Sequence, residues 1–167
     1  MRRWSHTLAV LLLTATTLST VGCKSRTVYH HYEHTAATGW EKDDTLFFHV
    51  APMKKSAVLR EEVGLRINSL YPFMGLSLIV QQTTLHRQEE KGNVMRNHIT
   101  RTDTLNCNLI DQRGNTKGKG INFYQYDFHL TDLSLNDGDS LCIAIHHNMK
   151  REILPGIVDV GIKLQAY

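Results

Sequence analysis

Residues 126–145, with the sequence YDFHLTDLSLNDGDSLCIAI, decide the fold. Apolar residues occupy every second position on both sides of a central turn. These positions are Tyr126, Phe128 and Leu130 before the turn, and Leu141, Ile143 and Ile145 after it. A period of two is typical of a β-strand with one buried face. The turn is Asn136-Asp137-Gly138-Asp139, in which Gly138 can adopt a positive φ, so the stretch predicts two strands joined by a tight turn.

The same alternation recurs along the chain from Trp40 onward. It is present in residues 45–50, 62–68, 76–81, 105–109 and 158–164. A convincing helical stripe is missing from the sequence, and residues 56–63, the weak candidate, fit better as the entry to a strand. About seven or eight strands with turn signals and no crossover helix predict an all-β fold. We expect a single antiparallel β-sandwich with a jelly-roll or immunoglobulin-like topology.

Two polar segments do not follow this alternation. Residues 86–101 predict either an extended hairpin or a mobile loop. Residues 113–125 contain the string Gly118-Lys119-Gly120, which superficially resembles a phosphate-binding loop. It lacks the Ser or Thr that follows the lysine in such loops, and no helical pattern comes after it. A nucleotide ligand is therefore not expected.

The first 22 residues have the order of a secretory signal. Arg2 and Arg3 are followed by an apolar run at residues 8–13 and by small residues directly before Cys23. The run is shorter than the roughly 20 residues of a spanning helix. A cysteine at this point resembles the lipobox of bacterial lipoproteins, although Thr20 occupies the position where Leu is usual. The sequence therefore predicts a signal peptide at residues 1–22 and lipid attachment at Cys23, which would hold the chain at a membrane.

Residues 23–38 have no apolar period and predict a lipidated tether, followed by the sandwich domain at residues 39–167. Within this tether, His30, His31 and His34 supply imidazoles, which zinc and copper favour as ligands. A flexible tether offers no fixed coordination geometry, so no metal site is expected.

The charge of the chain excludes some classes of partner. It has 19 Lys and Arg against 16 Asp and Glu, and two of the arginines belong to the signal peptide. The mature protein is thus close to neutral. This balance supports neither a nucleic-acid interface nor a polybasic membrane patch.

Two cysteines remain besides Cys23, and an envelope compartment would permit a disulfide between them. Cys107 has the same strand parity as Leu105 and Leu109, which predicts that it faces the core. Cys142 has the opposite parity to Leu141, which predicts that it faces outward. The pattern favours two unpaired thiols.

The sequence does not nominate a catalytic site. His146 and His147 are adjacent on a predicted strand and should point to opposite faces, so only one could serve a single site. A nucleophile elbow of the G-x-S-x-G type is absent from the sequence. Neither an enzyme activity nor a cofactor is therefore expected.

Aromatic residues in the predicted loops are better functional candidates. Tyr71, Phe73, Phe123 and Tyr124 lie in or beside segments rich in Gly or Pro, where they could contact a protein partner or stack on a sugar ring. The alternative for each is that it plugs an open end of the sandwich. Trp40, which follows Gly39, is best explained as packing at the core or its rim.

Several segments, taken in order, resemble the GldH family of gliding-motility lipoproteins from the Bacteroidetes. They are the lipobox with Val28-Tyr29, residues 39–45 (GWEKDDT), residues 68–73 (NSLYPF) with Leu76, residues 118–120 (GKG), residues 149–152 (MKRE) and residues 154–161 (LPGIVDVG). The resemblance implies an envelope lipoprotein needed for gliding, a surface movement linked to the type IX secretion machinery, with no catalytic activity.

Cys23 is followed by Lys24-Ser25-Arg26 and not by the acidic residues associated in this phylum with export to the cell surface. We therefore expect a lipoprotein on the outer membrane that faces the periplasm. The leading hypothesis is a non-enzymatic component that binds other envelope or motility proteins. The alternative is a glycan-binding sandwich module that uses the loop aromatics.

Overall fold

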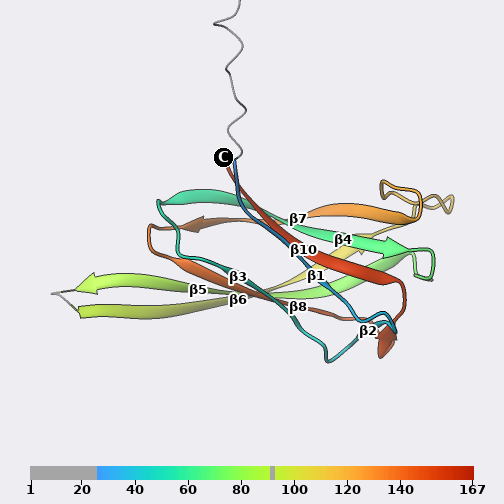
Figure 1. The fold of residues 1–167 in the computed structure, drawn as a ribbon, viewed down its shortest axis with the longest axis horizontal. Coiled ribbons are helices and arrows are strands. Elements are labelled where there is room, and N and C mark those ends of the chain that lie inside the picture. Colours follow the sequence, from blue (N-terminus) through green and yellow to red (C-terminus); the bar gives the residue numbers. More distant parts are fainter. Residues whose placement is uncertain (1–25, 91–92) are drawn as a thin grey trace, which may run out of the picture.

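The computed structural model describes residues 26–90 and 93–167 (Figure 1). These residues form β-strands and contain no helix. The strands are β1 (Thr27–His34), β2 (Trp40–Glu41), β3 (Leu46–Val50), β4 (Ala57–Asn68), β5 (Gly75–Glu90), β6 (Asn93–Asn108), β7 (Phe123–Leu135), β8 (Ser140–His147), β9 (Ile153–Leu154) and β10 (Ile157–Ala166). Among them there is also no helix long and apolar enough to cross a membrane.

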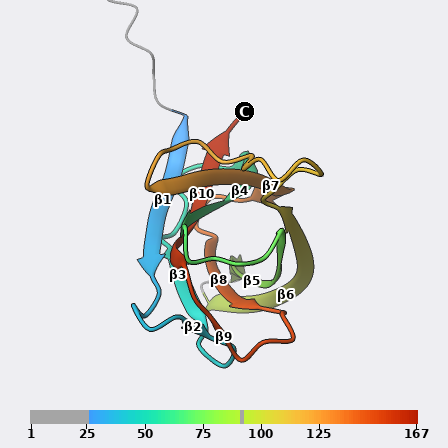
Figure 2. The same ribbon diagram turned by 90° about the vertical axis from the view of Figure 1, so that its right-hand side faces the viewer.

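Eight of the strands form two four-stranded antiparallel sheets that pack face to face (Figure 2). Their orders are β1-β10-β4-β7 and β3-β8-β5-β6, and the short strands β2 and β9 pair separately. The pairs β1–β10, β3–β8, β4–β7 and β5–β6 are nested, as if one long hairpin had been rolled into two sheets. This order is that of a jelly roll. It confirms the predicted all-β sandwich and decides between the two topologies considered.

The core lies between the sheets and follows the predicted alternation. In β8 the buried apolar residues are Leu141, Ile143 and Ile145, and in β5 they are Leu76, Leu78 and Val80. The turn at residues 136–139 has Gly138 at a φ of 81° and a hydrogen bond from the Asp139 N–H to the Asn136 carbonyl, as predicted.

A β-bulge in β7 changes which residues face the core. Glu61 pairs with Thr131 and Glu62 pairs with His129, so Leu130 has no direct cross-strand partner. Before the bulge the even-numbered Tyr126 is buried, whereas after it the odd-numbered Leu135 is buried. The extra residue thereby reverses the inward parity along the strand.

The predicted tether at residues 23–38 is wrong for residues 27–34, because these form strand β1, which pairs with β10. Tyr29 packs against the core, and the His31 ring lies edge-on to the buried Phe48 ring at 6.4 Å. The strand carries Tyr, His and Glu where a central strand would carry aliphatic residues, so it shows no apolar period. The sandwich thus begins at Thr27 and not at residue 39. The predicted signal peptide and Cys23 lie outside the described residues.

Residues 86–101 form an extended hairpin, which was one of the two predicted alternatives. Pairing of β5 with β8 ends at Leu85 and Ser140, whereas pairing of β5 with β6 continues to Glu90 and Asn93. The two strands therefore project beyond the rest of their sheet, as seen at the left of Figure 1.

The two described cysteines face opposite ways, as predicted. Cys107 on β6 is buried, and Cys142 on β8 is partly exposed, and both are free thiols. Burial raises the pKa of the Cys107 thiol to about 12, so this group stays protonated and unreactive at neutral pH.

Candidate functional site at the loop end

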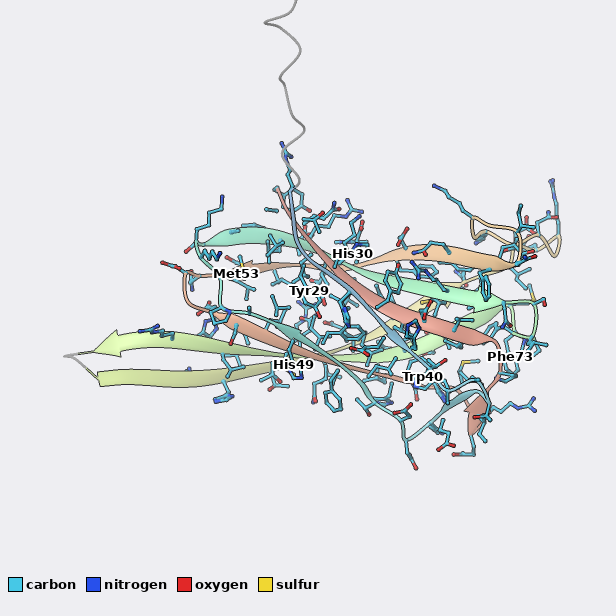
Figure 3. The ribbon with its side chains drawn as sticks, viewed as in Figure 1. Tyr29, His30, Trp40, His49, Met53 and Phe73 are labelled. Carbon is cyan, nitrogen blue, oxygen red and sulfur yellow. The ribbon has the colours of Figure 1, made fainter. Side chains whose placement is uncertain are left out.

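One end of the sandwich is built from three connections. They are residues 69–74 between β4 and β5, residues 109–122 between β6 and β7, and the β9 turn before β10. The end of β4 pairs with the start of β7 at Asn68 and Phe123. We call this region the loop end; it lies at the right of Figure 1, and Trp40 and Phe73 mark it in Figure 3.

The connection after β4 is held against the turn before β10. The Asn68 N–H donates to the Gly156 carbonyl at 2.9 Å, and the Leu70 N–H donates to Asn68 Oδ1 at 2.9 Å. Gly156 has a φ of 81°, and a Cβ there would lie 2.7 Å from the Leu70 carbonyl carbon and even closer to the Tyr71 nitrogen. Glycine is required because of both the backbone conformation and this close approach. Two of the segments that carry the family resemblance thus meet in space.

Trp40 packs inside the protein at the same end. Its side chain is fully buried, and its indole Nε1–H donates to the Asp44 carbonyl at 2.9 Å. Trp40 pairs with Leu154 across β2 and β9, and its ring meets the His147 ring edge-on at 5.4 Å. The interpretation of Trp40 as a packing residue is therefore confirmed.

His147 is buried beneath the loop end, and the preceding His146 is partly exposed on the other face, as the strand parity predicts. Burial lowers the pKa of His147 below its usual 6.5. Its Nδ1 accepts a long hydrogen bond of 3.4 Å from the Met149 N–H, and its Nε2 has no partner among the described residues. The ring is thus held neutral inside the protein.

The glycine-rich string of the β6–β7 connection forms a strand-like bridge. Lys119 and Gln125 exchange two backbone hydrogen bonds, of 3.0 and 2.9 Å. A Cβ on Gly118 would lie 2.6 Å from the Tyr126 ring, so the absence of a side chain lets this loop lie flat on the aromatic ring. The backbone forms no helix N-terminus here, which agrees with the rejection of a phosphate-binding loop.

The four aromatic candidates differ in accessibility. Phe123 is 55% exposed, whereas Phe73 and Tyr124 are half-buried and pack against the core. For Tyr71 the alternative prediction, that it plugs an open end of the sandwich, is confirmed, because the residue is only 7% exposed. Its hydroxyl donates to the Gly75 carbonyl at 2.9 Å and its ring packs edge-on against Phe73, so Tyr71 closes the end of the sandwich.

Three aliphatic side chains that the sequence reasoning did not single out are more exposed than these aromatics. Together with Phe123 they form what we call the loop-end patch. Its members are Leu70, Met74, Ile121 and Phe123, each more than half exposed. The Met74 carbonyl accepts hydrogen bonds from the backbone of residues 109 and 110, which joins two of the connections. In the sequence, the feature that could have pointed to these three residues is that each is apolar and lies close to turn-forming residues.

A hollow of about 590 Å³ lies beside this patch. Met74 and Ile110 contribute apolar walls, and Asp111, Arg113 and Lys117 contribute charge. Asp111 accepts hydrogen bonds from the Arg113 and Asn115 N–H groups, both at 2.8 Å, and these bonds to Asn115 and Arg113 lower its pKa. The hollow is therefore rimmed by fixed charges of both signs.

A second polar cluster lies on the outward face of the β1-β10-β4-β7 sheet. The carboxylate of Asp159, 4% exposed, accepts from Arg66 Nη1 at 3.3 Å and contacts His34 Nδ1. The Arg66 guanidinium lies over the Tyr32 ring at 4.2 Å and also donates to Gln125 Oε1 at 2.8 Å. These contacts fasten the edge strand β1 across three neighbouring strands, which gives Asp159 of the resemblance segment a structural role.

The three histidines of the predicted tether do not converge. The His30 ring contacts Tyr32 on the outward face, whereas the exposed His31 lies on the other face of β1, beside Phe48 and Glu33. In the part of the chain that the structure describes, no group of three or more His, Cys, Asp or Glu residues is placed to hold a metal ion.

Comparison with known proteins gives a family match and a similar curated protein. The model of the family described as "GldH lipoprotein" matches residues 27–164. A protein named "Gliding motility lipoprotein GldH" from Flavobacterium johnsoniae is 26% identical over 163 residues, which cover 93% of this chain and 94% of that protein. The family match begins at Thr27, where the structure places the first strand.

Solved structures offer only distant similarities. An aminopeptidase from a marine sediment Thaumarchaeota archaeon is 9% identical with a TM-score of 0.38, and a CocE/NonD family hydrolase from Staphylococcus aureus is 10% identical with a TM-score of 0.34. The alignments cover 87% and 86% of this chain but 32% of each hydrolytic protein, so the chain spans about a third of their length. At these TM-scores neither similarity contributes to the assignment of fold or activity.

Proposed function

The chain belongs to the GldH lipoprotein family, and from this membership we propose that it is a non-enzymatic accessory component of a gliding machinery linked to type IX secretion. Family membership makes it a gliding-motility-associated lipoprotein, lipid-anchored at the cell envelope. The proposed mode of action is a protein–protein contact: the loop-end patch binds another envelope protein of the machinery.

The observation that carries this proposal is the exposure of the loop-end patch. Leu70, Met74 and Ile121 come from two connections that are hydrogen-bonded to each other, and Phe123 is the first residue of β7. Ile121 is 89% exposed. Exposed apolar groups that gather within a polar rim mark interaction sites more often than single ones do. Here Arg113 and Lys117 line the hollow together with Met74, one member of the patch. Aromatic and Met side chains are enriched at the centres of protein interfaces.

The composition of the patch favours a protein partner over a glycan. Sugar rings stack on flat aromatic faces, and of the four aromatic candidates only Phe123 is mostly exposed. Tyr71, which the glycan hypothesis would need, is buried. The remaining patch members are aliphatic, and aliphatic side chains fill pockets in a partner protein.

The positions of Glu61 and Cys107, two titratable groups with strongly shifted pKa values, support a non-enzymatic role. Burial raises the pKa of Glu61 to about 8 and that of Cys107 to about 12. Both groups lie between the two sheets and not in the hollow at the loop end. Catalytic groups with shifted pKa values need access to a substrate, which these positions do not provide.

A double substitution tests the patch. Ile121→Ser/Phe123→Ser is expected to reduce the yield of the crosslinked partner about tenfold or more, because a central apolar anchor contributes at least about 1.4 kcal/mol to binding. Stability should stay within about 0.5 kcal/mol, since both side chains are exposed. The measurement is chemical crosslinking in intact envelopes, capture of the chain and quantitative mass spectrometry against wild type.

The matched control is Phe47→Ser/Ile99→Ser, which removes two apolar side chains from β3 and β6 that are each 53% exposed. This variant should recover the same partner as wild type. If the loop-end variant also does so, or if the two variants lose it equally, the patch is not the binding site.

We further propose that Cys23 carries the lipid and that the protein faces the periplasm from the outer membrane. The support is the lipobox-like sequence before Cys23 together with the family match. Radiolabelled palmitate should enter the full chain but not a Cys23→Ser variant. Protease added to intact cells should spare the domain and digest it after the outer membrane is permeabilised. Label in the Cys23→Ser product would disprove the proposed attachment site. Digestion of the domain on intact cells would disprove the proposed orientation.

A further inference from the structure

An apolar groove lies at the opposite end of the sandwich from the loop-end patch. Its volume is about 380 Å³, and it is formed by the start of β1 and the connection between β3 and β4. Val28, Pro52 and Met53 contribute apolar walls, and Lys54 and Lys55 stand at its margin. We call it the anchored-end groove; Tyr29, His49 and Met53, which also line it, are labelled in Figure 3.

The register of the sheet fixes where this groove lies relative to the two ends. Thr27 at the start of β1 pairs with Gln165 near the end of β10, whereas Ile157 at the other end of β10 pairs with Ile67 beside the loop end. The ten residues of β10 span about 30 Å at roughly 3.3 Å per residue. The start of β1 and the loop-end patch are thus separated by about the length of the sheet.

The proposed lipid attachment point, Cys23, is only a few residues in the sequence from β1, whose start lines the groove. Cys23 precedes Thr27, the first residue of β1, by four positions. Even fully extended, four residues span only about 14 Å. A lipid on Cys23 therefore keeps the start of β1 and the groove beside it within about 14 Å of the membrane surface, and the concentration of lipid at the groove is correspondingly high.

We propose that the anchored-end groove docks on the bilayer, with Lys54 and Lys55 among the phosphate groups of anionic phospholipids. Both lysines are exposed, and neither forms an ion pair with a carboxylate among the described side chains of residues 26–87 and 97–167. Val28 is 43% exposed at a bulge in β1, beside the groove. Apolar side chains flanked by lysines are the combination that binds a membrane interface, and such binding adds to the hold of a lipid anchor.

This contact would give the domain a fixed orientation, which a lipid alone does not provide. With the groove against the bilayer, the loop-end patch lies about 30 Å farther along β10, on the side away from the anchor. The near-neutral charge of the whole chain does not argue against it, because two exposed lysines at the right place act locally. The inference rests on the lipid proposed at Cys23, but it goes beyond the protein contact proposed above and does not depend on that contact.

Lysine labelling of the lipidated full-length protein tests the proposal. The protein is placed in detergent micelles, in phosphatidylcholine vesicles, or in phosphatidylcholine vesicles with a minor share of phosphatidylglycerol. Amine-reactive acylation is followed by mass spectrometry. On the anionic vesicles, modification of Lys54 and Lys55 should slow by about fivefold or more. Lys117 and Lys119 at the loop end are the internal controls and should react at an unchanged rate.

Three results would overturn the proposal. They are equal labelling of all four lysines on anionic vesicles, equally strong protection of Lys54 and Lys55 on phosphatidylcholine alone, and protection by inorganic phosphate added to the micelles. The last result would indicate an adventitious anion site.

The Val28→Asp variant should lose the protection while keeping the thermal unfolding temperature of wild type, because Val28 is partly exposed. The Ile121→Ser/Phe123→Ser variant should keep the protection, so failure here and failure of the proposed function are distinguishable.

Discussion

Replacing Glu61 by Gln is expected to raise the free energy of unfolding by several kcal/mol at alkaline pH and to remove much of its pH dependence. Glu61 on β4 is fully buried between the sheets. Gln82 Nε2 donates to Glu61 Oε2 at 2.6 Å, and Oε1 has no partner among the described residues. Burial, and secondly the negative charge of Asp103, raise the pKa of Glu61 to about 8.

The sign of the effect follows from this direction. Because the folded-state pKa is above the usual 4.5, the native protein keeps a proton that the unfolded chain releases. The stabilisation is fully present below pH 4.5 and is lost as the pH rises through about 8. At about 1.4 kcal/mol per pH unit, the loss is roughly 5 kcal/mol at most. Gln is neutral at every pH and can still accept the hydrogen bond from Gln82, so the variant avoids this loss.

Urea unfolding at about pH 5, 7 and 9 measures the effect. The matched control is Glu62→Gln, the neighbouring residue that faces outward and pairs with Arg60 at 3.0 Å and Lys163 at 3.2 Å. This control should change stability by about 1 kcal/mol or less and leave the pH slope unchanged. His147, whose pKa is lowered, destabilises the protein as the pH falls below 6.5, but it does so in all three proteins. Parallel pH profiles for wild type and Glu61→Gln would rule out a protonated Glu61.

Gly156→Ala should destabilise the protein strongly, by about 4 kcal/mol or more. Alanine at a φ of 81° is strained by roughly 1–2 kcal/mol. In addition, the new Cβ would overlap backbone atoms of Leu70 and Tyr71. A side chain could relieve such an overlap by changing its rotamer, but the backbone cannot. Relief would require β4 and β10 to separate where the Asn68 N–H donates to the Gly156 carbonyl. We therefore expect a fall of about 10 °C or more in Tm.

Gly114→Ala is the matched control, because Gly114 has a φ of 83° but no atom lies within 4 Å of the position that a Cβ would take there. This variant isolates the backbone strain and should cost about 1–2 kcal/mol. The difference in the free energy of unfolding between the two variants, measured by thermal and urea unfolding, reports the contribution of the close contact between residues 68–73 and residues 154–161. Equal losses in the two variants would show that this contact does not matter.

Much of the fold could be predicted from the sequence, because the two faces of each central strand differ in polarity. Leu141, Ile143 and Ile145 on β8 alternate with partly exposed residues, and the opposite orientations of Cys107 and Cys142 followed from the same parity. Such a pattern survives wherever one face of a strand is buried and the other meets solvent.

Strand β1 could not be predicted in the same way. As an edge strand it is buried on neither face completely, and it is held by polar contacts such as those of Tyr32 with Gln125 and Arg66. These partners are more than 30 positions away in the sequence, so no local sequence pattern predicts the contacts. The bulge at Leu130 was missed for a related reason: only the pairing of Glu61 and Glu62 reveals it.

The candidate site was found in part. Phe123 was correctly placed in an exposed position, whereas Tyr71 turned inward because its hydroxyl finds the Gly75 carbonyl. Leu70, Met74 and Ile121 were overlooked, since isolated apolar residues in loops are common and nothing in their neighbours distinguishes exposed from buried ones. Their proximity depends on the nested pairing of the strands, which only the three-dimensional structure provides.

The nested pairing also bears on how the protein reaches its destination. Thr27 and Gln165, which pair in the outermost layer of the nest, are 138 residues apart in the chain. Such distant partners close late, because a long loop must first be ordered. The domain thus stays incomplete until its last strand is available. If the proposed signal peptide exports the chain N-terminus first, the chain would remain unfolded during that passage. Closure of β10 onto β1 would then take place after translocation, when both ends have arrived in the same compartment.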